Sequence, residues 1–305
     1  MNCEWMRGCA TALVTPFGAD GAVDIERTRA LAARQVEGGV RILVPCGTTG
    51  ESVTMSGAER EQVIGEAVEA AKGRARVIAG TGSNNTAHAV EQSRRAAEIG
   101  ADAVLVVAPY YNKPTQEGLY QHFRAVAGAV PDTPVVLYNV PGRTSSNISA
   151  ETTLKLAREV ENVAAVKEAS GNLAQIMEII RKRPEGFLVL SGDDAMTFAL
   201  VALGGDGLVS VASNEAPGPL SRMVDAALEG RWDEARGLHY RWLPLMDVNF
   251  VESSPGPVKA AMALMGLVEE NLRLPLVPVT EKTRERVREV LSELGLLEET
   301  SHVAA

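Results

Sequence analysis

The hydrophobic positions of the chain fall into eight short apolar segments, and each segment is followed by a stretch with helical periodicity. The apolar residues within a segment run continuously instead of alternating with polar ones, which is typical of strands buried on both faces of a parallel sheet. Eight such units within roughly 220 residues favour an α/β fold of the (β/α)8 TIM-barrel type over an open sheet. The predicted strands are residues 9–15, 41–45, 76–80, 103–109, 134–139, 163–168, 187–192 and 207–213.

The strand pattern stops near residue 220, and the rest of the chain has the pattern of amphipathic helices. We therefore predict a (β/α)8 barrel over residues 1–220 that carries the active site, and a C-terminal helical region over residues 221–305. The helices predicted beyond the last strand are residues 220–230, 232–251, 257–268 and 280–297, with a proline-rich connector at 271–280.

Composition and charge narrow the functional classes. The 305 residues carry a formal net charge of −9 and no segment is dense in Lys or Arg, so we expect no nucleic-acid partner. No run of 18 apolar residues occurs and the N-terminus lacks the pattern of a signal peptide, so we expect no membrane span. Cys3, Cys9 and Cys46 lack CxxC spacing and are typical of free thiols in the cytoplasm. The four histidines have no metal-ligand spacing, so we expect no metal.

Polar clusters follow the carboxyl ends of five predicted strands. In a barrel of this type these ends form one rim, where the chemistry takes place. Each cluster alone is compatible with an ordinary loop, but their common placement predicts one site. The clusters are GTTGE at 47–51, PYYNKP at 109–114, YNVPGRT at 138–144, Lys167 near the end of the sixth strand, and SGDD at 191–194.

Lys167 has the clearest chemical meaning, because an ammonium group after the apolar run 163–166 is costly to bury. Successive strand residues face opposite sides, so Lys167 and Glu168 cannot both point inward. A Lys167 that reaches solvent and pairs with Glu168 is the simpler structural alternative. If Lys167 faces the barrel interior, desolvation favours the neutral amine, which is the nucleophile of imine chemistry.

Two further clusters suit a small carboxylic acid. The glycine-flanked Thr48 and Thr49 offer hydroxyls and main-chain amides for a carboxylate, although a tight turn alone explains the same sequence. Tyr138 ends a strand, where a tyrosine is often part of the core. Arg143 follows a Pro-Gly turn, from which its planar guanidinium can face a carboxylate.

Three other motifs are assigned to local structure. Residues 80–85 lack the third glycine of a dinucleotide fingerprint and are interpreted as a loop between a strand and a helix. Asp193 and Asp194 fit helix capping better than a catalytic carboxylate pair. Residues 204–207 are interpreted as a glycine-rich turn into the eighth strand and not as a phosphate site.

These motifs together resemble those of the dihydrodipicolinate synthase family. The family belongs to the pyruvate-dependent Schiff-base (class I) aldolases, the superfamily that includes N-acetylneuraminate lyase. The likeness runs nearly end to end, and the Lys and Tyr motifs are specific to the superfamily. The matching segments are ATALVTPF, GTTGE, PYYNKPTQEGLYQHF, YNVPGRT, KEASGN, LSGDD, GGDGLVSV, VESSPGPVKAAM and LRLPLVPVT.

The resemblance implies the condensation of pyruvate with L-aspartate 4-semialdehyde to 4-hydroxy-tetrahydrodipicolinate, a lyase-type step of lysine and diaminopimelate biosynthesis. Lys167 would form the Schiff base with pyruvate, and Tyr138 would donate and accept protons. Thr48 and Tyr111 would complete a hydroxyl relay to solvent, with Tyr111 reaching in from a neighbouring subunit. A phenol in such a relay can both give and take a proton.

The resemblance also implies binding roles and an assembly. Thr49 and the main chain of Val209 would hold pyruvate, and Arg143 would bind the carboxylate of the semialdehyde. No metal or organic cofactor is required. A homotetramer built as a dimer of dimers is expected on this ground alone.

One departure from the family concerns feedback by L-lysine. Sensitive relatives bind lysine at a subunit interface through a carboxylate and histidines. Here the positions that match the histidines are Gly57 and Arg60, and the carboxylate position is His88. A cationic Arg60 and a missing carboxylate would repel a lysine ammonium, so weak or absent inhibition is expected. The other matching positions, Ser52, Asn84 and Tyr110, are retained.

Two alternatives remain beside the synthase. Another pyruvate-dependent aldolase, acting on a sugar acid or other 2-oxo acid, would share Lys167 and Tyr138, and only Arg143 and Thr48 would discriminate it. A catalytically idle barrel that serves as a transcriptional or metabolite-binding partner is the third hypothesis. The intact set of Lys167, Tyr138, Thr48 and Tyr111 argues against it.

Overall fold

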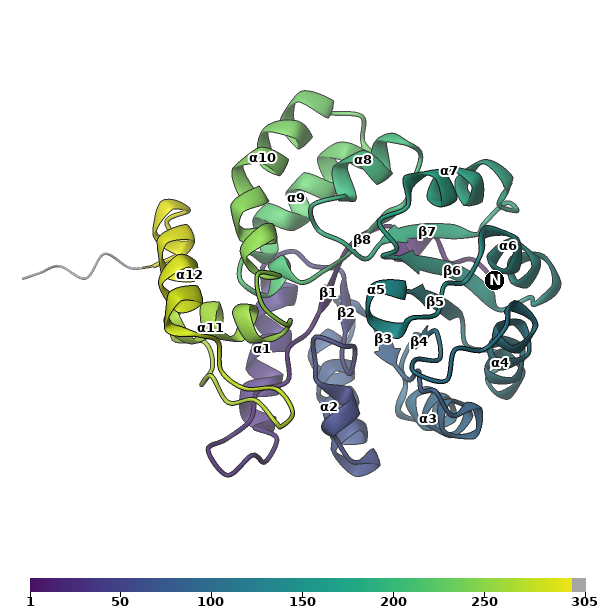
Figure 1. Ribbon diagram of the computed structural model, residues 1–305, viewed down its shortest axis with the longest axis horizontal. Helices are drawn as coiled ribbons and strands as arrows, with labels where there is room; N and C mark the ends of the chain where they lie inside the picture. Colours follow the sequence, from purple (N-terminus) through teal and green to yellow (C-terminus); the bar gives the residue numbers. More distant parts are fainter. Residues whose placement is uncertain (298–305) are drawn as a thin grey trace, which may run out of the picture.

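The computed structural model describes residues 1–297 and contains a closed barrel of eight parallel strands, which confirms the predicted fold (Figure 1). The barrel closes where the first and last strands pair, with Ala10 opposite Val209. The strands are β1 (Gly8–Ala12), β2 (Ile42–Val44), β3 (Arg76–Gly80), β4 (Ala103–Val107), β5 (Val135–Asn139), β6 (Val163–Glu168), β7 (Leu188–Ser191) and β8 (Gly207–Ser210).

A helix after each strand covers the outside of the barrel. The third of these has clear caps at both ends, because the Asn85 side chain accepts from Ala87 N–H at 3.0 Å and Gly100 ends the helix with a φ of 104°. The barrel helices are α1 (Ile25–Glu37), α2 (Gly57–Ala71), α3 (Thr86–Ile99), α4 (Gln116–Ala129), α6 (Ala150–Glu159), α7 (Leu173–Lys182), α8 (Thr197–Ala202) and α9 (Pro217–Leu228). Shorter elements are η1 (Glu4–Met6), η2 (Ser52–Thr54), α5 (Pro141–Thr144) and η3 (Ala212–Asn214).

Each strand buries both of its faces, as the continuous apolar runs predict. In β5, Val135 and Leu137 pack outward in the cluster between strands and helices, whereas Val136 and Tyr138 belong to the cluster inside the barrel. Tyr138 is in register with Lys167 on β6. Because paired residues of neighbouring strands point to the same face, Lys167 also points into the barrel.

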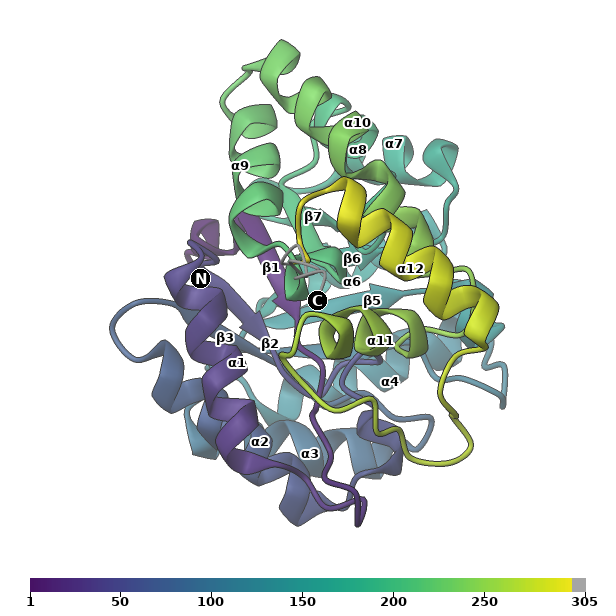
Figure 2. The same cartoon turned by 90° about the vertical axis from the view of Figure 1, so that its left-hand side faces the viewer.

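The C-terminal region packs against one side of the barrel, next to α1 and α9 (Figures 1 and 2). Val258 and Met262 of α11 belong to one buried cluster together with Leu31 of α1. The boundary predicted at residue 220 falls inside α9, which packs on β1, so the barrel's own helices run on to Leu228. The division into two domains stays a prediction, and its residues 298–305 lie outside those described. The three helices are α10 (Trp232–Val248), α11 (Gly256–Leu264) and α12 (Glu281–Glu293).

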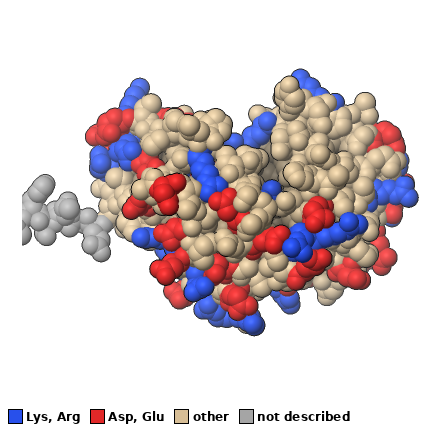
Figure 3. Space-filling view, turned by 90° about the horizontal axis from the view of Figure 1, so that it is seen from below, with Lys and Arg blue, Asp and Glu red and all other residues tan. Residues whose placement is uncertain are grey.

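Charged side chains of both signs are interspersed on the molecular face shown in Figure 3. Over the whole structure, surface charges form ion pairs, for example Arg29 with Glu66 and Arg222 with Glu234, each at 2.6 Å. Among residues 1–297, every helix is too short or too polar to span a bilayer.

His122 on α4 is a buried histidine from which we expect a contribution to the acid sensitivity of the fold. Its side chain is 4% exposed, and Nδ1 lies 2.9 Å from Thr86 Oγ1. Burial lowers the pKa of His122 to about 4. The unfolded chain takes up the proton near pH 6.5, so the stability due to this difference is present above that pH and is lost as the pH falls toward 4. The difference between the pKa of His122 in the unfolded and the folded protein corresponds to about 3 kcal/mol in the free energy of unfolding.

We therefore expect His122→Met to remove part of the acid sensitivity. Between pH 6.5 and 4 the free energy of unfolding of the wild type should fall by about 3 kcal/mol more than that of the variant. Urea unfolding at a series of pH values measures this. Parallel curves for the two proteins would contradict the assignment.

Candidate active site

Lys167 lies inside the barrel at the carboxyl end of β6, with 6% of its surface exposed. Its Nζ is 4.1 Å from the ring centroid of Tyr138, the neighbour in register on β5. Within residues 1–297, Lys167 forms no ion pair. The alternative of a solvent-exposed lysine that pairs with Glu168 is therefore wrong.

Glu168 points to the opposite face of β6 and is held by neutral donors. Asn139 Nδ2 donates to its Oε1 and Gln175 Nε2 to its Oε2, both at 3.0 Å, and Ser170 N–H also donates to Oε1 at 3.0 Å. Burial raises the pKa of Glu168 above its usual range. Glu168 thus anchors the end of β6 from outside, and its charge does not neutralise Lys167.

Gly192, the residue after β7, makes room for Lys167. A Cβ on Gly192 would lie 2.8 Å from Lys167 Cε and 2.8 Å from Ala169 Cβ. Such distances are shorter than real Cβ contacts allow, so the lysine side chain would have to move. In the motif SGDD, the glycine therefore matters as well as the carboxylates, because its lack of a Cβ leaves space for Lys167.

We expect Gly192→Ala to slow imine formation by about tenfold to a hundredfold, because a displacement of about 1 Å at a reacting atom has effects of that size. The rate at which borohydride traps pyruvate on the protein measures this. Gly237→Ala on α10 is the matched control, since a Cβ there meets nothing within 4 Å. Equal trapping rates in wild type and Gly192→Ala would contradict the expected clash.

Two adjoining cavities open at this rim, of about 130 Å³ and about 370 Å³. Both are lined by Thr48, Tyr138, Val140 and Arg143, and Lys167 lines the smaller. The size of the smaller cavity suits an acid of few heavy atoms. Its remaining lining residues are Thr49, Ala169, Gly192, Asp193, Val211, Phe250 and Ser254.

The loop 47–51 has the form of an anion cradle. Gly50 N–H donates to Gly47 O at 3.2 Å and Glu51 N–H to Thr48 O at 3.1 Å, which folds the loop into consecutive turns. Within residues 1–297, the N–H groups of Thr48 and Thr49 between them donate no hydrogen bond. Thr49 is buried in the smaller cavity, whereas Thr48 lies at the mouth. Free amides and two hydroxyls in one turn suit a carboxylate.

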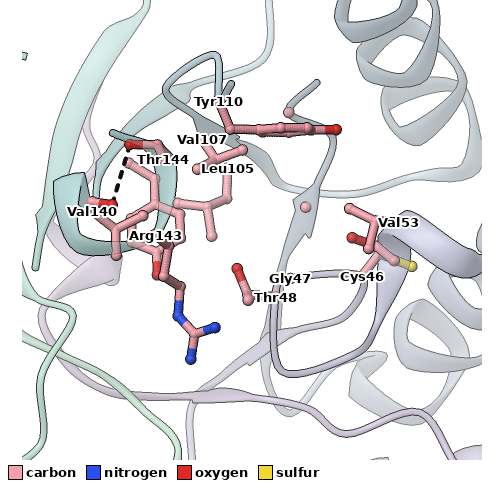
Figure 4. Close-up of a pocket in the computed structure, with 14 residues that line it drawn as sticks. Cys46, Gly47, Thr48, Val53, Leu105, Val107, Tyr110, Val140, Arg143 and Thr144 are labelled. Carbon is pink, nitrogen blue, oxygen red and sulfur yellow. Dashed lines mark hydrogen bonds between the residues drawn. The ribbon is translucent and has the colours of Figure 1, made fainter. Parts of the chain in front are cut away.

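Arg143 extends into the same space from α5, where its guanidinium lies next to Thr48 (Figure 4). Pro141 begins this short helix, and Thr144 Oγ1 donates to Val140 O at 3.2 Å, the bond drawn in the figure. Arg143 forms no ion pair within the described part of the chain. Its planar fork is thus free for a carboxylate that enters the cavity.

Two residues of the expected set lie outside the cavities. Tyr111 is 87% exposed on the loop after β4, held with a φ of 73° and a bond from its N–H to Thr144 O at 3.3 Å. Val209 has its side chain in the interior cluster, and Val211, two residues further on, lines the cavity instead. A single chain therefore brings together Lys167, Tyr138, Thr48, Thr49 and Arg143, but not Tyr111.

Sequence reasoning missed several lining residues. Asp193 lines the smaller cavity, and its Oδ1 accepts from Met196 N–H at 3.2 Å in the turn that leads into α8. The helix itself has no side-chain cap, and the expected capping role is wrong for Asp194, which instead accepts from Val211 N–H at 2.9 Å.

Phe250 and Ser254 reach the cavity from the segment between α10 and α11. Ser254 belongs to the matching segment VESSPGPVKAAM, but that segment contains no motif that indicates a role in the site. Within residues 1–297, no group of three His, Cys, Asp or Glu residues is arranged to hold a metal ion.

A (β/α)8 barrel with a buried lysine against a tyrosine at its rim, next to an arginine that has no ion pair within residues 1–297, suits the chemistry of an imine-forming aldolase. The sequence profile of the Dihydrodipicolinate synthetase family matches residues 5–294. The chain belongs to this family.

Individual relatives agree over almost the whole length. The chain is 56% identical to a 4-hydroxy-tetrahydrodipicolinate synthase of Koribacter versatilis (strain Ellin345), an alignment that covers 96% of this chain and 97% of the relative. It is similar to the crystal structure of dihydrodipicolinate synthase from Aquifex aeolicus, with a TM-score of 0.94, 46% identity, and coverage of 96% and 100%. It is also similar to the chloride-inhibited enzyme of Acinetobacter baumannii complexed with pyruvate, with a TM-score of 0.93, 42% identity, and coverage of 96% and 100%.

Proposed function

We propose that this chain condenses pyruvate with L-aspartate 4-semialdehyde to 4-hydroxy-tetrahydrodipicolinate through an imine on Lys167. The observation that carries the proposal is the buried Lys167 amine beside Tyr138, in a cavity of about 130 Å³ that also contains Arg143. The likeness to a relative that is complexed with pyruvate supports the first substrate.

Each step uses a group that the cavity provides. The Lys167 amine attacks the ketone carbon of pyruvate, and loss of water gives the imine. A methyl proton then leaves, which converts the imine to an enamine, and the enamine carbon attacks the aldehyde. The amine of the semialdehyde finally displaces Lys167 and closes the ring. Tyr138 lies against Nζ and moves the protons of these steps, with Thr48 next in line.

The carboxylates of the two substrates bind at different places in the cavity. Thr49 and the free amides of its loop hold the pyruvate carboxylate near Lys167. The main chain at Val209 does not line the cavity in the single chain, and in our proposal it contacts pyruvate once the substrate is bound. Arg143 holds the carboxylate of the semialdehyde at the mouth. A short amino-acid carboxylate matches an unpaired guanidinium better than a polyol tail does, which favours the synthase over a sugar-acid lyase.

The exposed Tyr111 fits an assembled protein. In our proposal the chain forms a homotetramer, a dimer of dimers in the cytoplasm, and Tyr111 of one copy completes the relay from Thr48 in another. A large aromatic side chain that is 87% exposed supports such a contact.

Borohydride reduction in the presence of pyruvate, followed by mass spectrometry, tests the proposed chemistry. We expect a single adduct on the peptide that contains Lys167. A coupled assay then supplies pyruvate with L-aspartate 4-semialdehyde, or N-acetylneuraminate alone. Turnover of the sugar acid and not of the semialdehyde would reassign the substrate, and the absence of any adduct would refute the imine mechanism.

Feedback by L-lysine is expected to be weak or absent. Arg60 Nη2 donates to Gly80 O at 2.9 Å, and Gly80 lines the larger cavity together with Ser52 and Tyr110. A cation at this place repels the ammonium groups of lysine. Steady-state rates with millimolar lysine should match those without it, and half-maximal inhibition at sub-millimolar lysine would contradict the prediction. The variant Gly57→His/Arg60→His/His88→Glu should gain sensitivity.

A further inference from the structure

The loop that carries Thr48 and Thr49 ends in a buried ion pair with the C-terminal region. Glu51 Oε1 lies 2.5 Å from Lys259 Nζ on α11, and both side chains are fully buried. The main-chain N–H of Arg273, in the connector before α12, donates to Glu51 Oε2 at 3.1 Å. Two segments of the C-terminal region thus hold one carboxylate of the active-site loop.

Besides Glu51, two further groups contact the Lys259 ammonium group. Its Nζ also donates to Asn271 O at 2.8 Å and lies 4.3 Å from the ring centroid of Phe17. Burial lowers the pKa of Lys259, and the attraction of Glu51 opposes that shift. Because desolvation offsets much of the attraction in a buried pair, well-packed apolar residues would stabilise the fold as well. The stability of the fold alone therefore does not account for the pair.

The backbone transmits the position of Glu51 to the threonines. Glu51 has a φ of 52°, in the left-handed region, and its N–H donates to Thr48 O at 3.1 Å. On the other side of the loop, Thr15 Oγ1 donates to Gly50 O at 2.8 Å. A shift of the Glu51 side chain would therefore move the turn in which Thr48 and Thr49 present their amides and hydroxyls.

The continuation of the loop is held by the same region. The Arg273 guanidinium donates to Thr54 O at 2.9 Å and to Glu59 Oε1 at 2.5 Å. Thr54 ends η2, whose residues Ser52 and Val53 line the larger cavity. Residues 51–59 are thus bound at both ends to the C-terminal connector.

We propose that Glu51 and Lys259 are positioning residues, through which the C-terminal region sets the distance of Thr48 and Thr49 from Lys167. This inference rests on the proposed function, since it assigns the pair a role in that reaction. Lys167 itself is on β6 and has no contact with the pair. Loss of the pair should therefore impair pyruvate binding and proton transfer but leave Lys167 able to form an imine.

The experiment compares Lys259→Met, Glu51→Gln and the double variant Glu51→Gln/Lys259→Met with the full-length wild type. We expect kcat to fall by about tenfold to a hundredfold and KM for pyruvate to rise, because displacement of a catalytic hydroxyl by about 1 Å has effects of that size. At saturating pyruvate, borohydride should still trap Lys167 to the wild-type extent. Arg284→Met is the matched control, since Arg284 pairs with Glu270 within the C-terminal region and does not reach the loop.

The double variant separates positioning from the presence of an unpaired buried charge. It contains neither charge, so it should regain the Tm that Lys259→Met loses, while its kcat stays low. If Lys259→Met does not fold, kcat and KM are measured on the double variant instead. A variant that loses only Tm, with kcat and KM for pyruvate within about twofold of wild type, would overturn the inference. A wild type that traps no pyruvate would refute the proposed function, and the inference with it.

Discussion

Replacement of Lys167 by alanine should abolish both pyruvate trapping and turnover. Among residues 1–297, Lys167 contributes the only amine that lines the smaller cavity, and none of the other described side chains there can form an imine. Loss of a covalent nucleophile lowers kcat by about ten-thousandfold or more. Borohydride reduction with pyruvate followed by mass spectrometry, together with the coupled assay, measures the two effects separately.

Lys167→Arg and Lys155→Ala are the controls for this result. Arg keeps a cation near the Tyr138 ring but cannot form an imine, so it should be as inactive as alanine. Lys155 on α6 also lies over a tyrosine ring, with Nζ 4.0 Å from the centroid of Tyr120, but it is far from the rim, so its variant should keep full activity. Adduct formation in Lys167→Ala would show that another amine is the nucleophile.

The strands and the rim could be predicted because their signals are local. Continuous apolar runs fix which segments are buried on both faces, and the parallel barrel then brings the ends of β2, β5, β6 and β7 to one side. The alternation of β6 was enough to separate Lys167 from Glu168. The alternation alone did not decide which of these two side chains points into the barrel, because it separates the two faces of the strand without identifying the inner one.

The rest of the site depends on contacts between distant segments. Nothing near Gly192 in the sequence indicates that its missing Cβ leaves space for Lys167, because the two residues meet only when β6 and β7 pair. Phe250 and Ser254 reach the cavity from a segment in which no motif indicates a role in the site, and Glu51 meets Lys259 only through the packing of α11. Such residues carry ordinary local signals, so periodicity and motif spacing do not reveal them.

Replacement of Tyr138 by phenylalanine should separate imine formation from proton transfer. The ring remains, so its packing inside the barrel and its contact with Lys167 Nζ at 4.1 Å should persist. Only the hydroxyl that exchanges protons is lost, and such a group contributes about a hundredfold to ten-thousandfold to the rate. We expect turnover to fall by that factor, while pyruvate still becomes trapped on Lys167.

Exchange of the pyruvate methyl protons with deuterium isolates the step. The enamine forms when a methyl proton leaves, so the wild type should exchange these protons in heavy water without the second substrate, and Tyr138→Phe should exchange them far more slowly. Tyr120→Phe removes a hydroxyl that donates to Glu159 at 2.7 Å, away from the rim, and should exchange like the wild type. If Tyr138→Phe exchanged at the wild-type rate, the proton would have to pass through the Thr48 hydroxyl or water, and Tyr138 would serve only to pack against Lys167.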